Sequence, residues 1–236
     1  MRIDKLLSNL KYGSRHDMKT FISKVEIKVG NQVIKDPGFI VDPNKDLIYI
    51  DGNQLFYKEE IHLLFYKPKG YLSAHHDQMH PCLVELIKEP YHRFDFAMAG
   101  RLDLDAEGLM ILTTSGSFAH QITHPRYHLR KIYEVMLDRD FIDSDQLLAG
   151  VWIKDGKNNP YLSKALSIEI ENNRVTLSID EGKFHQVKRM FLALNYEILN
   201  LKRLQIGNLT LRDLKAGEYM EFRKEELYDR NDLTSI

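Results

Sequence analysis

The sequence MAGRLDLDAEGLMILTTSG, residues 98 to 116, decides the fold. Residues 109 to 112 are continuously apolar and lead into Thr-Thr-Ser-Gly, which is typical of a short core strand closed by a turn. Asp103 precedes this strand and is expected at the edge of the core, where a carboxylate can take part in chemistry. The structural alternative is that Asp103 caps a turn while Asp105 and Glu107 are solvated, because aspartate is common in turns.

The composition indicates an ordinary globular protein. The chain has 236 residues, 43% hydrophobic and 28% charged, enough for one mid-sized core plus a small satellite domain. Strands come in runs without regular strand-helix alternation, which predicts an α+β fold with a mixed, largely antiparallel sheet. The lone Cys82 has no disulfide partner and no zinc-ligand spacing around it, which indicates a reducing cytoplasm. We expect no leader and no membrane span, because no apolar stretch approaches about 18 residues.

Charge is distributed unevenly along the chain. The net charge is −1, but residues 1 to 30 hold seven Lys or Arg against three acids, a local excess of 7 − 3 = +4. A basic head of this kind favours contact with a polyanion, although a short segment of +4 also arises by chance.

The N-terminal residues predict two helices followed by a hairpin. Apolar residues recur with helical spacing over residues 2 to 10, and Ser14-x-x-Asp17 is a capping pattern that predicts a second helix. Alternation over residues 25 to 29, a Gly30-Asn31 turn and a return strand predict the hairpin. Basic residues lie off the apolar face of the first helix and at the start of the second, namely Arg2, Lys5, Arg15, His16 and Lys19.

RIDKLLSNLKYGSR, followed by VEIKVGNQVI and DLIYIDG, resembles the small RNA-binding domain of the S-four type over residues 1 to 52. We therefore predict this domain at residues 1 to 58, with residues 53 to 61 read as the linker, and a catalytic domain at 59 to 236. The resemblance implies RNA contacts by Arg2, Lys5, Arg15 and Lys19, since basic helix starts are natural phosphate sites. A generic helical satellite would explain the apolar faces but not the basic helix starts.

GRLDLDAEGLMILT is similar to the pattern G-R-L-D-x-x-T-x-G-L-L-L-L-T of the RsuA-type RNA pseudouridine synthases. The resemblance places Asp103 at the position of the catalytic nucleophile and Arg101 beside it as an RNA contact. Ala106 departs from the pattern, which usually has threonine there. KPKGY, residues 67 to 71, resembles the first motif of that family and implies that Lys67 and Lys69, with Tyr71, contact the RNA backbone; a charged turn at a strand end is the alternative.

A second motif follows a basic loop that spans residues 120 to 131. KIYEV, residues 131 to 135, resembles the family motif K-x-Y-x-V, which implies that Tyr133 stacks against the target base. Taken alone, an alternating strand of this kind would place Tyr133 in ordinary cross-strand packing.

EGKFHQVKRMFLAL, residues 181 to 194, predicts a helix with apolar residues on one face. At 100° per residue, Lys188 lies about 110° and Arg189 about 150° from the centre of that face, so Lys188 borders the core while Arg189 and His185 point outward to RNA. The stretch resembles the family's third motif, which implies that Lys188 supplies the cation paired with the nucleophile. Arg203 follows on a strand as a further RNA contact, with Leu204 or Ile206 as the apolar floor for the base.

The remaining segments predict supporting structure. We expect a helix at 143 to 151, a loop at 155 to 160, a hairpin of 165 to 170 with 174 to 179, a closing strand at 217 to 222 and a loose tail after Tyr228. The clustered histidines, His75, His76, His80 and His92, do not predict a metal site, because they lie among turn residues that offer no fixed ligand frame.

Together the motifs predict an RNA pseudouridine synthase that uses no cofactor and no metal. The predicted catalytic residues are Asp103, Tyr133 and Lys188. The substrate expected is a uridine of 16S rRNA in a partially assembled small subunit. This expectation follows from the third motif, which reads HQVKRMF where many similar large-subunit enzymes carry HQVRRMF, and from a chain that ends soon after GEYMEF. A monomer is expected. The alternatives are an enzyme of the same family acting on 23S rRNA, a non-catalytic RNA-binding protein, and a glycoside hydrolase that pairs Asp103 with Asp105.

Overall fold

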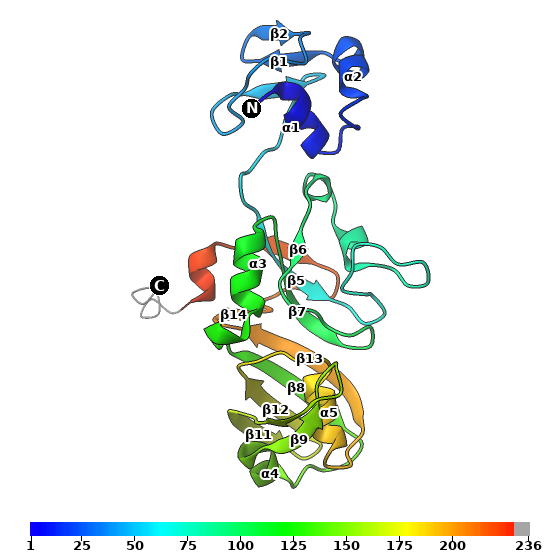
Figure 1. Cartoon of the computed structure of the whole chain (residues 1–236), viewed down its shortest axis with the longest axis vertical. Coiled ribbons are helices and arrows are strands. Elements are labelled where there is room, and N and C mark those ends of the chain that lie inside the picture. The colour runs from blue at the N-terminus through cyan, green and yellow to red at the C-terminus, as the bar shows by residue number, and fades with distance from the viewer. Residues whose placement is uncertain (229–236) are drawn as a thin grey trace. The chain divides into compact units, whose positions relative to one another are not determined.

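The computed structural model describes residues 1 to 228, so the predicted loose tail lies outside the described residues. Two compact units are present: residues 1–61 with 87–96, and residues 62–86 with 97–228 (Figure 1). No helix in this described part of the chain is long and apolar enough to span a membrane.

The first unit combines two helices and a small sheet. Its elements are α1 (Ile3–Asn9), α2 (Met18–Lys24), β1 (Ile27–Val29), β2 (Gln32–Ile34), β3 (Ile48–Ile50) and β4 (Asn53–Gln54). The strands follow the order β2-β1-β3-β4, with every pairing antiparallel. The predicted apolar faces of both helices are buried, and Ile3, Leu7, Met18 and Ile22 are fully enclosed with the inward residues of the sheet. Two helices therefore precede the hairpin, as the sequence predicts.

The segment 87–96 completes this first unit, although it follows β5 in the chain. Phe56 packs edge-on against Tyr91 and Phe94, with ring centroids 5.5 and 5.9 Å apart. Lys11 forms an ion pair of 2.8 Å with Asp95. Aromatic contacts over this sequence separation cannot be read from local patterns.

The second unit is built on one large sheet and a separate two-stranded sheet of residues 151–154 and 160–163. The strands are β5 (His62–Lys67), β6 (Ala97–Met98), β7 (Glu107–Thr113), β8 (Lys131–Leu137), β9 (Val151–Lys154), β10 (Pro160–Ser163), β11 (Ser167–Glu171), β12 (Arg174–Ile179), β13 (Ile198–Ile206), β14 (Leu209–Thr210) and β15 (Tyr219–Glu221). The helices are α3 (Gly116–Thr123), α4 (Ser144–Ala149) and α5 (Gln186–Leu192). Short 3₁₀ turns occupy Leu83–Leu86, Tyr91–Arg93, Pro125–Tyr127 and Lys224–Leu227, of which Tyr91–Arg93 belongs to the first unit.

The large sheet has nine strands and runs β11-β12-β8-β13-β7-β5-β15, with β14 on β13 and β6 on β7. Only the pairing of β13 with β7 is parallel among these strands. The predicted α+β fold with a mixed, largely antiparallel sheet is confirmed. The apolar run after Asp103 forms β7 at the centre of the sheet, and its residues 109 to 112 have no exposed surface.

Two helices differ from the sequence prediction. The basic loop predicted from residue 120 begins inside α3, whose Phe118 and Ile122 pack into the core beside β7. Helix α5 begins at Gln186 and not at residue 181, because His185 takes the left-handed conformation with φ of 48°. Both helices lie in the second unit, α3 near β7 and α5 near β9 (Figure 1).

Candidate active site

The loop that carries Asp103 lies between β6 and β7 and is fixed by the segment that follows β5. Lys67 Nζ donates hydrogen bonds to the carbonyl oxygens of Asp103 at 2.9 Å and Ala106 at 2.6 Å. Ser73 Oγ donates to the carbonyl oxygen of Leu102 at 2.8 Å and accepts from its backbone N–H. These bonds hold the backbone on both sides of Asp103, so the position of its carboxylate is set by the frame of the sheet.

Lys67 is not an RNA contact, and here the structure corrects the sequence prediction. Its side chain has no exposed surface, and all three of its donated hydrogen bonds go to backbone carbonyls. Burial lowers the pKa of Lys67 to about 8, while the nearby carboxylate of Asp103 opposes this shift. The KPKGY motif therefore anchors the loop of Asp103 through its first lysine, whereas Lys69 is exposed.

Arg203 is predicted as a further RNA contact on its strand, and the structure shows that its side chain is buried. It is 2% exposed, its Nε donates to the carbonyl oxygen of Leu109 at 2.7 Å, and its Nη1 lies 3.5 Å from the hydroxyl of Tyr133. Strands β13 and β7 pair in parallel at this point, with Arg203 opposite Gly108, so closely that a Cβ on Gly108 would lie 2.3 Å from the carbonyl oxygen of Arg203. The glycine lets these strands meet, and the buried guanidinium then lies beside the tyrosine.

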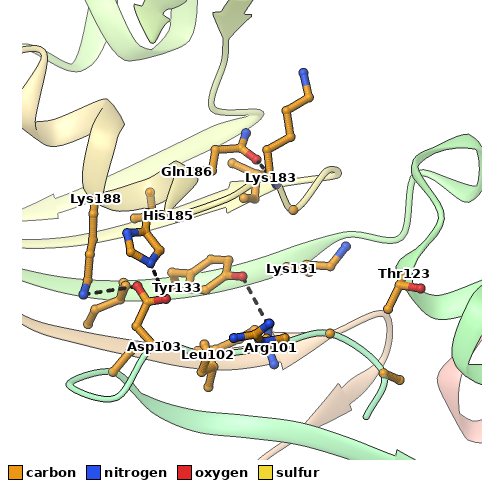
Figure 2. A pocket seen from close by; sticks show the side chains of 18 of the residues that line it. Arg101, Leu102, Asp103, Thr123, Lys131, Tyr133, Lys183, His185, Gln186 and Lys188 are labelled. Atoms are coloured by element: carbon orange, nitrogen blue, oxygen red, sulfur yellow. Dashed lines mark hydrogen bonds and ion pairs between the residues drawn. The ribbon is translucent and has the colours of Figure 1, made fainter. Parts of the chain in front are cut away.

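The start of α5 brings two nitrogen groups to Asp103. His185 Nε2 lies 3.1 Å from Asp103 Oδ1, and Lys188 Nζ lies 3.2 Å from Asp103 Oδ2. Gln186 fixes the turn before the helix, because its Oε1 accepts from the backbone N–H of Lys183 at 2.9 Å and its Nε2 donates to Glu181 at 2.7 Å. The carboxylate is thus held from both of its oxygens (Figure 2).

Lys188 bridges two carboxylates. Its Nζ lies 2.6 Å from Asp105 Oδ1, in addition to the contact with Asp103. Burial opposes the ionised form of Asp105, but the hydrogen bond and charge of Lys188 outweigh it, so the pKa of Asp105 is lowered. Burial likewise opposes the charge on Lys188, and the two carboxylates outweigh it, so the pKa of Lys188 is raised. The ammonium therefore stays charged at neutral pH.

A pocket opens over this cluster and continues along β8. Asp103, Tyr133, Lys188, His185 and Arg203 all line it. Figure 2 shows Tyr133 next to Asp103, with Lys131 and Thr123 at the end of the pocket away from Lys188. The structure thus brings the three predicted catalytic residues together in one cavity.

The pocket also contains residues that sequence reasoning missed or misplaced. Leu201 lines it, whereas Leu204 and Ile206, the predicted apolar floor, do not. Lys131 is 8% exposed and donates to the carbonyl oxygen of Leu129 at 2.8 Å. Burial lowers the pKa of Lys131 to about 8, and the charge of Arg203 adds to this effect. The sequence signal that could have identified Lys131 as a pocket residue is its position two residues before Tyr133 in the KIYEV motif.

His185, predicted to point outward, is 42% exposed and also contacts Asp103, whereas the predicted outward orientation of Arg189 is wrong. His185 precedes the helix in a left-handed conformation, so helical geometry does not apply to it, and its ring turns toward Asp103. Arg189 is half-buried, and its Nη1 donates to the carbonyl oxygens of Lys154 and Asp155. Arg189 thus ties α5 to the end of β9.

The other predicted RNA contacts are exposed basic side chains. Arg101 and Lys69 lie at the surface of the second unit, and Arg2, Lys5, Arg15 and Lys19 lie at the surface of the first. Arg2 forms an ion pair of 2.7 Å with Asp4, so part of its charge is already compensated within the chain.

The geometry of Asp103 and Asp105 does not support the alternative of a glycoside hydrolase. Asp103 and Asp105 share one ammonium, which occupies the space between them where the paired carboxylates of a glycoside hydrolase need room for a sugar. Within residues 1–228, no three His, Cys, Asp or Glu side chains group in a way that could hold a metal ion.

Comparisons with known proteins define the class. The family model for RNA pseudouridylate synthase matches residues 61–193, and the S4 domain model matches residues 1–47. The chain belongs to the RNA pseudouridine synthase family, which are isomerases, and carries an N-terminal S4 RNA-binding domain. The RsuA-type resemblance and the S-four-type head are thereby confirmed.

Relatives cover nearly the whole chain. It is 38% identical to an uncharacterized RNA pseudouridine synthase of Bacillus subtilis (strain 168), over 98% of this chain and 99% of the relative. It is 34% identical to the ribosomal small subunit pseudouridine synthase A of Escherichia coli (strain K12), over 96% and 98% of the two chains. A crystal structure of a pseudouridylate synthase superposes with a TM-score of 0.64 at 29% identity, covering 96% and 98% of the two chains.

Proposed function

We propose that this enzyme converts one uridine of 16S rRNA into pseudouridine, with Asp103 as the reacting carboxylate. The observation that supports the chemistry best is the contact of Asp103 with both Lys188 and His185 inside a pocket that also contains Tyr133. The choice of 16S rRNA is supported by the full-length similarity to the small-subunit synthase of Escherichia coli (strain K12).

The reaction is an isomerisation in which no atom is gained or lost overall. The bond from the ribose C1′ to N1 of uracil breaks, the base turns, and C5 bonds to C1′. The proton on C5 leaves and N1 takes up a proton, so no redox cofactor is needed. The ionised carboxylate of Asp103 attacks the sugar or the base, or removes the proton. In each case the ammonium of Lys188 lies 3.2 Å from the reacting carboxylate and forms an ion pair with it.

The target uridine has to leave its helix or loop to reach Asp103, at a cost of a few kcal/mol. Tyr133 is 6% exposed and lines the pocket beside the carboxylate, so its ring offers a stacking surface for the extruded uracil. Stacking of a base on an aromatic side chain recovers about 1 to 3 kcal/mol. Arg203 Nη1 lies 3.5 Å from the tyrosine hydroxyl and helps to position the ring from that end.

The RNA is held outside the pocket by the exposed basic residues. Arg101, Lys69 and the N-terminal Arg2, Lys5, Arg15 and Lys19 supply phosphate contacts. We further propose that the enzyme works as a cytoplasmic monomer on a partially assembled small subunit, because so few basic contacts specify a site poorly on naked RNA. Sedimentation of the purified protein tests the monomer.

Mapping of pseudouridines in total rRNA from a strain that lacks this gene tests the target. We expect one 16S uridine to remain unmodified, and the wild-type gene to restore its modification. Loss of a 23S site with every 16S site intact would refute the 16S assignment. A parallel assay with uridine-tritiated RNA separates the reaction classes: tritium release without free base supports isomerisation, whereas free base indicates glycosidic hydrolysis.

A further inference from the structure

An exposed aromatic side chain adjoins the active pocket. Phe184 is 53% exposed, and its ring stacks on His185 with a centroid distance of 3.9 Å and an interplanar angle of 19°. A phenylalanine at the surface contributes little to the core, and the reaction at Asp103 gives it no role. Its neighbour in the stack lies 3.1 Å from the carboxylate of Asp103. The two rings therefore extend from the reacting group to the protein surface.

The ring of Phe184 is held in place from several sides. The guanidinium carbon of Arg189 lies 4.9 Å from the ring centroid, and this guanidinium is bound by the backbone at the end of β9. Gly156 also lies against the phenylalanine, since a Cβ there would be 3.3 Å from Cβ of Phe184. A ring fixed in this way can bind a partner without first losing rotational freedom.

Basic side chains with some exposed surface lie close to Phe184 in the sequence, and each also has a partner within the chain. Lys183 pairs with Glu181 at 3.4 Å. Lys188 pairs with two carboxylates, and Arg189 donates to backbone carbonyls. Exposed aromatic rings combined with basic groups are the features by which proteins bind single-stranded nucleic acid. The core of an interface with a protein partner is instead depleted of lysine and of acidic residues. The exposed ring, its stacking on a residue that lines the active pocket and the basic groups beside it therefore point to RNA as the occupant of this surface.

Extrusion of the target uridine leaves the nucleotides beside it without a stacking partner on one side. Specific recognition of RNA commonly uses such unstacked bases, placed on aromatic side chains. We propose that Phe184 and His185 form a stacking surface for a base directly adjacent to the target uridine. The proposal rests on Asp103 being the reacting carboxylate, because that places the uridine next to His185.

Equilibrium binding to RNA fragments tests the proposal. The fragments are centred on the modified uridine, whichever rRNA contains it, and carry the natural base or an abasic nucleotide at each neighbouring position, so the number of phosphates is constant. We expect Phe184→Ala to raise Kd by about 5- to 150-fold, which corresponds to the loss of one stacked base. Phe184→Tyr should restore the affinity, because the tyrosine ring stacks equally well. Leu192→Ala is the matched control, an exposed apolar residue on α5 that does not line the pocket.

The abasic fragments separate stacking from a structural effect. We expect one of the two abasic positions to weaken wild-type binding by the same factor as Phe184→Ala, and to cause no further loss in that variant. An unchanged Kd in Phe184→Ala, as expected if the ring docks a protein, would overturn the proposal. The proposal would also be overturned if the abasic nucleotide weakened binding to Phe184→Ala by the same factor as it weakens binding to wild type. Failure of Asp103 as the reacting group would instead appear as retained turnover in Asp103→Asn, which the binding assay does not measure.

Discussion

The ammonium of Lys188 lies closer to Asp105 than to the carboxylate it is proposed to serve, at 2.6 Å against 3.2 Å from Asp103. The side chain of Asp105 is 73% exposed, whereas that of Asp103 is 27% exposed. Water can therefore replace Lys188 at Asp105 with little loss, but not at Asp103. Of the two ion pairs, we expect the longer, less exposed one to matter for the reaction.

Lys188→Met should lower kcat by at least about 100-fold while changing the Kd for RNA by less than about threefold. The reason is that methionine keeps the packing at the edge of α5 and removes the charge beside Asp103. Asp105→Asn is the matched control, because it removes the other carboxylate bound by the same ammonium, and kcat should stay within about threefold of wild type. Single-turnover kinetics and filter binding measure both. A larger loss in Asp105→Asn than in Lys188→Met would contradict this assignment.

The burial of Lys67 predicts a specific dependence of stability on pH. The pKa of Lys67 is about 8 in the folded protein and 10.5 for an ordinary lysine, so the folded state binds fewer protons between these values. Its contribution to the free energy of unfolding therefore rises as pH increases through that window and is constant below it. Relative to Lys67→Met, wild type should gain about 1 to 2 kcal/mol from pH 8 to pH 10. Urea unfolding at both pH values measures this gain, and no gain would mean that the ammonium is solvated.

The parallel pairing of β7 and β13 depends on Gly108. Its φ of 115° and the 2.3 Å approach to the carbonyl oxygen of Arg203 leave no room for a methyl group. Gly108→Ala should lower the free energy of unfolding by at least about 2 kcal/mol, because strain and overpacking add. Gly116→Ala, where nothing lies within 4 Å, should change it by less than about 1 kcal/mol. Equal unfolding midpoints in urea for the two variants would rule out the close approach of Gly108 to the backbone of Arg203.

Two substitutions at Tyr133 distinguish the contribution of its ring from that of its hydroxyl. Tyr133→Phe keeps the stacking surface, so the Kd for RNA should stay within about twofold of wild type. Tyr133→Leu removes the aromatic ring and should weaken binding by about 5- to 150-fold. Trp152→Leu removes a 70% exposed aromatic side chain outside the pocket and serves as the control. If Tyr133→Leu binds as tightly as Tyr133→Phe, the ring does not stack on the extruded base.

Local patterns predicted the elements that bury a regular face. The apolar run after Asp103 became β7, and the stripe on α5 buries Met190 and Phe191 completely. Lys188 borders this stripe and reaches Asp103, as its angular position indicated. These features depend on periodicity, which a sequence displays directly.

The residues whose burial sequence reasoning did not predict depend on partners that are distant in the chain. Lys67 and Arg203 are basic residues whose ligands are backbone carbonyls contributed by other strands and loops, and no local pattern marks them as buried. The apolar pattern predicts that the helix includes His185. In the structure α5 begins one residue later, at Gln186, whose side-chain bonds fix the preceding turn. Helix α3 is not predicted, because His120 and the basic residues after it favour a loop, although Phe118 and Ile122 have helical spacing.

The most direct test of the proposed chemistry is turnover by Asp103→Asn. Asparagine keeps the shape of the side chain and loses its charge, so folding and RNA affinity should be retained, as checked by thermal unfolding and filter binding. Tritium release from uridine-labelled RNA should fall below about one thousandth of the wild-type rate, since loss of a nucleophile typically costs more than that. Turnover above that level by the folded variant would contradict the role of Asp103 as the reacting carboxylate.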